Sequence, residues 1–320
     1  MKHKTKALIT GISGFAGSYL AEFLLKKNIE VHGIMRWRSN ISNIEKCKDS
    51  LFLHEADLLD AHSLYTVIDE IQPDYVFHLA AQSFVKSSWA SPANTIEINM
   101  VGSVNLFEAI RKSKRETVIQ IACSSEEYGM VYENEVPIKE ANPLRPLSPY
   151  GVSKVGMDYL GYQYYQSYGL KIIRTRGFNH TGPRRGEVFA ESSFAKQIAE
   201  IEKGIREPVV CVGNLSAERD YTDVRDMVCA YYVAVTKCTS GEVYNICSGK
   251  TWKIKKVLDF LIDQSKIKVT IKEDSSRMRP SDVPILLGDC SKFTQETGWK
   301  TTIPFEQTLT DLLNYWREKV

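Results

Sequence analysis

The sequence has no cysteine pair with Cys-x-x-Cys spacing, no apolar run of the ~20 residues that a membrane span needs, and almost no net charge. Seven scattered cysteines in a chain of 320 residues exclude a disulfide framework and a cysteine zinc site, so we expect no metal. The 41 basic and 39 acidic side chains nearly cancel, which excludes nucleic acid and membrane surfaces as partners. The opening Met-Lys-His-Lys-Thr-Lys lacks the apolar core of a secretion signal, so we expect a cytoplasmic protein.

What the first half does contain is an alternation of short apolar runs with amphipathic segments. The apolar runs cover residues 6–10, 31–35, 74–79 and 117–123, and the amphipathic segments include residues 17–27 and 95–111. This alternation predicts repeated strand–helix units. The fold class expected is therefore α/β, a Rossmann-type doubly wound parallel sheet with ligands at the carboxyl ends of its strands.

The alternation becomes less regular from about residue 180, where prolines and glycines separate shorter segments. We expect a nucleotide-binding domain over residues 1–180 and a smaller mixed α/β substrate-binding lobe over residues 181–320. Residues 243–246 read as a further strand of the first sheet. Segments near residues 211–250 would then rejoin the first domain, and the two lobes would interleave.

A glycine-rich turn follows the first apolar run. Its members are Gly11, Gly14, Phe15, Ala16 and Gly17, and an amphipathic segment starts near Ser18. The first glycine permits the tight turn, the second lets backbone N–H groups approach a pyrophosphate, and the third allows close helix–strand packing. The pattern predicts a dinucleotide site, with a purely structural turn as the alternative.

The second strand is followed by Arg36, Trp37 and Arg38, where an NAD-binding protein normally carries an acidic residue. Two guanidinium groups suit the 2′-phosphate of NADP, so we expect NADP as the cofactor. The alternative is a solvated basic loop.

Other cofactor contacts are expected at later strand ends. Asp57 and Leu58 would meet the adenine edge, and the small residues around Leu79, Ala80, Ala81 and Ser83 would let the cofactor lie against backbone. His78 is more typical of a packed core histidine than of a catalyst.

Tyr150 and Lys154 lie four residues apart at the start of a segment, residues 151–168, with helical spacing of apolar residues. They would share one helix face, so the ammonium group of Lys154 could lower the pKa of the phenol. A phenolate tuned in this way could act as a general base on a hydroxyl group.

The strand over residues 118–122 leads into Ser124, Ser125, Glu126 and Glu127. Ser124 could bind the hydroxyl group that is oxidised. Glu126 indicates more than redox chemistry, because removal of a carbon-bound proton beside a ketone needs a base and hydride transfer does not. A carboxylate that pins the loop backbone is the alternative.

The whole set of motifs resembles the GDP-mannose 4,6-dehydratase family, a branch of the extended short-chain dehydrogenases/reductases, across nearly the whole chain. The motifs that carry the resemblance are Gly11/Gly14/Gly17, the segment from Leu79 to Ser83, Ser124 to Glu126, Tyr150/Lys154, the segment from Phe178 to Glu187, and the segment from Arg279 to Asp282. The last two are the most discriminating.

This resemblance implies a role for each matching residue. Ser124, Glu126, Tyr150 and Lys154 would be catalytic, and His180 and Arg185 would contact the cofactor. The sugar nucleotide would be held by Ser83, Ser124, Ser125, Glu126, Asn179, Lys196, Arg219, Arg279 and Asp282. Arg219 and Arg279 have interlobe or surface ion pairs as their alternative, and Lys196 has a solvated helix face.

The implied reaction is the conversion of GDP-mannose to GDP-4-keto-6-deoxymannose. NADP oxidises C4, water is lost across C5 and C6, and the hydride returns to C6. Tyr150 would take the hydroxyl proton and Glu126 the C5 proton. The enzyme would thus be a lyase that regenerates its cofactor in each turnover.

Two positions depart from the family pattern: Ser124 stands where the dehydratases usually have Thr, and Glu127 where they usually have an apolar residue. The stretch also resembles the NADPH-dependent reductases of GDP-4-keto-6-deoxymannose, which form GDP-rhamnose, so this activity is the alternative. A non-catalytic NADP-binding scaffold is a third reading.

A GDP-linked hexose and a second copy of the chain are the partners expected. The amphipathic segments 95–111 and 151–168 could form the four-helix bundle of a homodimer. In the resembled family the loop corresponding to residues 36–42 reaches a neighbour's cofactor, which would give a homotetramer.

Overall fold

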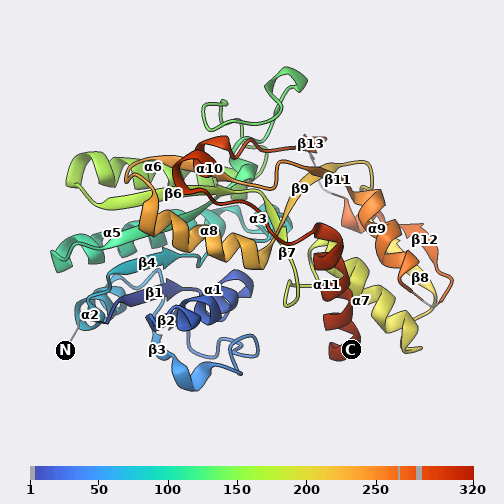
Figure 1. The fold of residues 1–320 in the computed structure, drawn as a ribbon, viewed down its shortest axis with the longest axis horizontal. Helices are drawn as coiled ribbons and strands as arrows, with labels where there is room; N and C mark the ends of the chain where they lie inside the picture. The colour runs from blue at the N-terminus through green and yellow to red at the C-terminus, as the bar shows by residue number, and fades with distance from the viewer. Residues whose placement is uncertain (1–3, 266, 279–282) are drawn as a thin grey trace.

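The computed structural model describes residues 4–265, 267–278 and 283–320, and its largest element is a seven-stranded sheet (Figure 1). The strand order is β10-β6-β5-β4-β1-β2-β3, and all six pairings are parallel. The strands are β1 (Lys6–Thr10), β2 (Glu30–Met35), β3 (Phe52–Glu55), β4 (Tyr75–His78), β5 (Val118–Ser124), β6 (Lys171–Gly177) and β10 (Val243–Ile246). The doubly wound parallel sheet expected from the sequence is confirmed.

Helices cover both faces of this sheet. Helices α1 (Phe15–Lys26) and α8 (Val224–Lys237) pack on one face, and α2 (Ala61–Ile71), α5 (Gly102–Ser113) and α6 (Pro149–Tyr168) pack on the other. Strand β1 shows why two cores form, since successive side chains point to opposite faces. Ala7 and Ile9 enter the core under α1 and α8, whereas Leu8 enters the core under α2 and α5.

The strand order reverses between β1 and β4, which lie side by side although β2 and β3 come between them in the chain. At such a reversal the two connecting segments leave toward opposite faces of the sheet, and a crevice opens beyond the carboxyl ends of the strands. This geometry places the turns after Thr10 and His78 next to each other.

The C-terminal part contributes smaller sheets at the right of Figure 1. Strands β11 (Thr251–Lys253), β9 (Glu218–Asp223), β13 (Ile285–Leu286) and β7 (Asn179–Thr181) form one sheet, and β12 (Thr270–Glu273) pairs with β8 (Val209–Val212). Helices α7 (Ala190–Glu202), α9 (Ile254–Asp263) and α11 (Phe305–Lys319) enclose a third core, and α10 (Ser291–Thr297) packs beside β10. Strand β10 joins the large sheet beside β6, as the sequence predicts for residues 243–246.

The helix expected over residues 95–111 is interrupted. Helices α3 (Val85–Ala90) and α4 (Pro92–Ile96) come first, and a π-helical segment (Glu97–Val101) connects α4 to α5. The wider turn places Asn99 inside the protein, and such π-helical turns are frequent at functional sites. Among the residues that the structure describes, none of the helices is both long and apolar enough for a membrane crossing.

Close packing at the start of α1 gives a stability prediction. A Cβ atom added to Gly17 would lie 2.2 Å from the carbonyl oxygen of Gly11, so the backbone itself would have to move. We expect Gly17→Ala to lower the free energy of unfolding by about 2 kcal/mol or more, measured by urea denaturation. Gly186→Ala is the control, because its added Cβ would meet nothing closer than 3.9 Å. Equal stabilities of the two variants would contradict the packing argument.

Candidate active site

A cavity of about 660 Å³ opens at the carboxyl edge of the large sheet, beside the point where the strand order reverses. It is lined by residues that follow β1, β2, β3, β4, β5 and β6 and by the first turns of α1 and α6. Most of the expected site residues line it: Gly11, Gly14, Phe15, Ala16, Gly17, Arg36, Asp57, Leu58, Leu79, Ala80, Ala81, Ser83, Ser124, Ser125, Glu126, Tyr150, Lys154, Asn179, His180 and Arg185. Residues as distant in the sequence as Phe15 and Arg185 thus line the same cavity.

The glycine turn fits a dinucleotide. Gly11 has a positive φ of 72°, and a Cβ atom there would lie 3.0 Å from the Cα atom of Ala80. Gly14 is the N-cap of α1 and makes no side-chain cap, so backbone N–H groups of the helix N-terminus face the cavity. Exposed N–H groups and the helix dipole together favour a phosphate at this position.

A buried hydrogen-bond network ties the two central strand ends together. The Oγ1 atom of Thr10 accepts from the backbone N–H groups of Leu79 and Ala80 at 3.1 and 3.0 Å and lies 2.9 Å from Nδ1 of His78. The other ring nitrogen of His78 lies 3.0 Å from the hydroxyl of Ser103. Burial lowers the pKa of His78 to about 3, so the neutral ring is a core histidine, as the sequence indicates.

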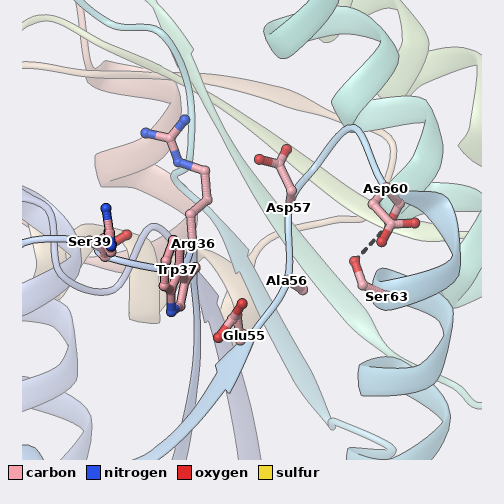
Figure 2. Close-up of a pocket in the computed structure, with 9 residues that line it drawn as sticks. Arg36, Trp37, Ser39, Glu55, Ala56, Asp57, Asp60 and Ser63 are labelled. Atoms are coloured by element: carbon pink, nitrogen blue, oxygen red, sulfur yellow. Dashed lines mark hydrogen bonds between the residues drawn. The ribbon is translucent and has the colours of Figure 1, made fainter.

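Arg36 and Arg38 stand where the sequence places them, at the adenosine end of the expected cofactor site. Both line a second pocket of about 470 Å³ that adjoins the first, together with Trp37 and Ser39 (Figure 2). The guanidinium group of Arg38 lies 4.1 Å from the ring centroid of Trp37. Glu55, Asp57 and Asp60 form the opposite wall of this pocket.

Ser124, Tyr150 and Lys154 come together at the ends of β5 and α6. The hydroxyl group of Ser124 lies beside the phenol of Tyr150, and the ammonium group of Lys154 donates to the carbonyl oxygen of Ala122 at 2.7 Å. Helix α6 begins here because Ser148 caps it, accepting from the N–H of Gly151 at 3.0 Å, and Pro149 fits its first turn. The set is the arrangement that the Tyr-x-x-x-Lys spacing predicts.

The pKa of Tyr150 differs from the sequence expectation. Burial raises the pKa of the phenol above its usual value, and the hydrogen bond from Ser124 lowers it only in part. Burial also lowers the pKa of Lys154. The net pKa of the phenol is therefore raised in this structure, because loss of solvation dominates. The lowering expected from Lys154 stays a prediction.

Glu126 lines the cavity beside Ser124, and its charge raises the pKa of Tyr150. Its backbone carbonyl packs against the first turn of α6, since a Cβ atom on Gly151 would lie 2.7 Å from that oxygen. A carboxylate thus belongs to the wall of the cavity near Ser124 and Tyr150. It can exchange a proton with a bound molecule there.

His180 and Arg185 form a wall of the cavity beside Phe15 of the glycine turn. The guanidinium group of Arg185 lies between the rings of Phe189 and Phe15, at 3.3 and 5.1 Å from their centroids, and the imidazole of His180 stacks on Phe15 at 6.0 Å. Burial and the charge of Arg185 lower the pKa of His180 to about 4, so the ring is neutral. Arg185 is then the cation at this wall.

Four residues were expected to bind the sugar nucleotide but are not found in the cavity lining. Two of them have other partners, and two lie outside the described residues. Lys196, on α7, pairs with Glu187 and Glu200 rather than lining the cavity. Arg219, on β9, donates to the backbone oxygens of Glu218 and Val283. Arg279 and Asp282 lie outside the described residues.

Several cavity residues and supports were not found from the sequence. Asn99 holds the loop at Gln82 through 2.8 and 3.1 Å hydrogen bonds and donates to Ser153 of α6 at 2.9 Å. Phe189 and Tyr231 also line the cavity. Asn99, Gln82 and Ser153 lie within segments that the sequence analysis describes, but none of the five residues was assigned a role there.

Comparisons with known proteins agree with the family resemblance that the motifs indicate. The family model of GDP-mannose 4,6 dehydratase matches residues 8–312. The chain is 31% identical to the GDP-6-deoxy-D-mannose reductase of Pseudomonas aeruginosa, covering 98% of each sequence, and 33% identical to the GDP-mannose 4,6-dehydratase of Vibrio cholerae, covering 97% of this chain and 93% of that one.

Solved structures agree on the fold. The structure of RMD from Pseudomonas aeruginosa complexed with NADPH superposes with a TM-score of 0.86 at 30% identity, covering 99% of this chain and 100% of that one. The UDP-glucose 4-epimerase of Thermus thermophilus in complex with NAD gives a TM-score of 0.88 at 28% identity, with the same coverage. The match of the family model over almost the whole length means that this chain belongs to the GDP-mannose 4,6-dehydratase family.

Proposed function

We propose that the chain is an NADP-dependent lyase that converts GDP-mannose to GDP-4-keto-6-deoxymannose. The observation that carries this proposal is the cavity position of Glu126 beside Ser124 and Tyr150. An alcohol dehydrogenase would need only the Ser–Tyr–Lys set, whereas water loss across C5 and C6 also needs a group that moves a carbon-bound proton. The dehydratase relatives of Vibrio and Yersinia species and of animals and plants, at 32–35% identity, support the same reading.

Each residue of the set has one task in this reaction. Bound NADP supplies a hydride acceptor that later returns the hydride. Tyr150 takes the proton of the C4 hydroxyl group while Ser124 holds that oxygen. Lys154, buried and fixed on the carbonyl of Ala122, places positive charge beneath the phenol. Glu126 takes the C5 proton, made acidic by the 4-keto group, and donates a proton to the departing C6 hydroxyl, which leaves as water. When the hydride returns to C6, C5 takes up a proton from the solvent, and Tyr150 releases to the solvent the proton that it took from the C4 hydroxyl group.

The preference for NADP is part of the proposal. Arg36 directly follows β2 and lines both pockets, and Arg38 lines the pocket next to it. A 2′-phosphate placed between them would receive charge-assisted hydrogen bonds from guanidinium groups.

The oligomer is proposed to be a homodimer through the outer faces of α4, the π-helical segment and α6. Side chains exposed there include Ile96, Val101, Val152, Tyr159 and Tyr168, between 38% and 57% accessible. Two such faces would pair as a four-helix bundle.

A second candidate is the reductase of the 4-keto product. The Pseudomonas aeruginosa reductase aligns with this chain over 315 positions, close to the length of the chain, whereas the alignment with the Vibrio cholerae dehydratase spans 353 positions. The reductase would use the same Ser124, Tyr150 and Lys154 and would leave Glu126 without a chemical step.

One experiment separates these candidates. Purified protein is incubated with GDP-mannose and catalytic NADP in deuterated water, and the product is examined by mass spectrometry and NMR. A 4-keto-6-deoxy sugar with deuterium at C5 and no accumulation of NADPH supports the dehydratase. Unchanged GDP-mannose, with NADPH consumed when the 4-keto sugar is supplied, overturns it in favour of the reductase.

The role of Glu126 predicts the behaviour of Glu126→Gln. The amide cannot accept the C5 proton, so we expect kcat to fall about 1000-fold with KM nearly unchanged. Oxidation at C4 should persist, and the variant should form one equivalent of NADPH from GDP-mannose. Loss of that NADPH signal as well would assign Glu126 to binding or folding instead.

The cofactor pocket predicts the effect of the double variant Arg36→Ala/Arg38→Ala. Loss of the two guanidinium groups should weaken NADP binding about 10- to 100-fold and leave NAD binding nearly unchanged, measured by calorimetry. Lys48→Ala is the control, since Lys48 is exposed and pairs with Glu45 away from both pockets. A wild-type protein that already prefers NAD would refute this assignment and direct attention to Glu55 as a ribose ligand.

The proposed dimer face predicts that Val152→Asp/Tyr159→Asp is a monomer by light scattering, because two charges would be buried at the centre of the interface. Tyr65→Asp on α2, where Tyr65 is 41% exposed, serves as the control and should keep the wild-type mass. An unchanged mass for the double variant would rule out this face.

A further inference from the structure

Glu127 belongs to the same turn as Ser124 and Glu126, but its side chain does not line the cavity. That side chain is fully buried, whereas the neighbouring Glu126 lines the cavity. The backbone N–H of Ser124 donates to Oε1 of Glu127 at 2.7 Å, and the N–H of Glu126 donates to Oγ of Ser124 at 3.2 Å. Both ends of the turn are therefore fastened by side chains within it.

The second carboxyl oxygen of Glu127 faces a buried guanidinium group. Oε2 lies 3.2 Å from Nε of Arg176, and the same Nε donates to Asp158 at 2.8 Å. Arg174 donates to the other oxygen of Asp158 at 2.6 Å. All four side chains are at most 10% exposed, and the two cations match the two carboxyl groups in number.

This cluster connects the turn to the catalytic helix. Asp158 is on α6, one turn beyond Lys154 and two beyond Tyr150. Arg174 and Arg176 come from β6, the strand beside β5. The contacts thus run from Ser124 through Glu127, Arg176 and Asp158 to the helix of the other catalytic groups.

The cluster already contains a cation beside its carboxylates. Cys123, Glu127 and Asp158 are the one group of potential metal ligands whose atoms approach within 4.8 Å of one another in the described chain. Arg176 ion-pairs with both carboxylates and takes the place that a metal would occupy. Burial and Asp158 raise the pKa of Glu127 well above its usual value, and Arg176 offsets this rise in part.

We propose that Glu127 is a positioning residue that holds Ser124 and Glu126 in register with Tyr150 and Lys154. It does so as an acceptor for the N–H of Ser124, anchored on Arg176. An apolar side chain of similar volume would fill the space but leave that buried N–H unpaired, and the turn would shift to satisfy it. The kinetic part of this inference rests on the proposed function.

Two variants separate the acceptor role from packing. Glu127→Gln retains an acceptor oxygen, so kcat should stay within about 3-fold of the wild-type value. Glu127→Leu has none, and a displacement of the turn by about 1 Å should lower kcat about 100-fold with KM within about 3-fold. Glu140→Gln is the control, because Glu140 accepts from the N–H of Asn245 near the same Arg176 without touching the turn.

A readout independent of turnover keeps the two proposals apart. Hydrogen–deuterium exchange of peptides spanning residues 118–129 should be faster in Glu127→Leu than in the wild type and unchanged in Glu127→Gln. A wild-type protein that turns over neither substrate would defeat the proposed function, while the exchange rates would still test Glu127. Equal exchange in wild type and Glu127→Leu overturns the positioning role.

Glu127→Asp covers the case in which the leucine variant does not fold. It keeps a carboxylate opposite Arg176 but withdraws the acceptor from Ser124 by one methylene group. We expect kcat about 10-fold lower and faster exchange of the turn. Wild-type kinetics and exchange in Glu127→Asp would mean that charge balance alone explains Glu127. Equal kcat losses in the Gln and Leu variants would also point to charge, because both variants keep the volume and lose the carboxylate.

Discussion

The hydrogen bond from the N–H of Ser124 to the carboxyl group of Glu127 is the interaction on which the geometry of the site depends. Strand β5 ends at Ser124, so this buried N–H leaves the sheet and needs another acceptor. Because Glu127 supplies it from within the turn, the chain reverses tightly and Glu126 lines the cavity. Arg176 ion-pairs with both Glu127 and Asp158. These contacts connect the turn to α6, the helix of Tyr150 and Lys154.

The shape of the glycine turn depends on close backbone contacts. Gly11 approaches Ala80 across the point where the strand order reverses, and Gly17 packs against Gly11. Thr10 and His78 satisfy the polar groups that this approach buries. Dehydration and ketone reduction both need this half and the Ser–Tyr–Lys set. Glu126 is the group whose chemical use differs between the two activities, so the family alone does not assign the reaction.

What could be predicted from the sequence depends on how local each signal is. Some features depend only on residues that are close together in the sequence, and the structure places them as expected. They are the glycine turn, the Tyr150/Lys154 spacing and the strand at residues 243–246. The positions of Lys196 and Arg219 depend on how the C-terminal elements pack, and both have partners away from the cavity. Asn99 and the partners of Glu127 come from elements distant in sequence. The pKa of Tyr150 is raised, whereas the sequence led us to expect a lowered value. The cause is burial of the phenol, which depends on the folded structure.

The most direct test of the account follows the hydride. GDP-mannose carrying deuterium at C4 is mixed with an equal amount of GDP-mannose labelled with carbon-13 throughout the hexose, and the products are analysed by mass spectrometry. The account predicts that deuterium reaches C6 of the product and stays on the molecules without carbon-13, because one site oxidises C4, moves the C5 proton through Glu126 and returns the same hydride. Deuterium on the carbon-13 product, or its transfer to free NADPH, would contradict a closed cycle at this site.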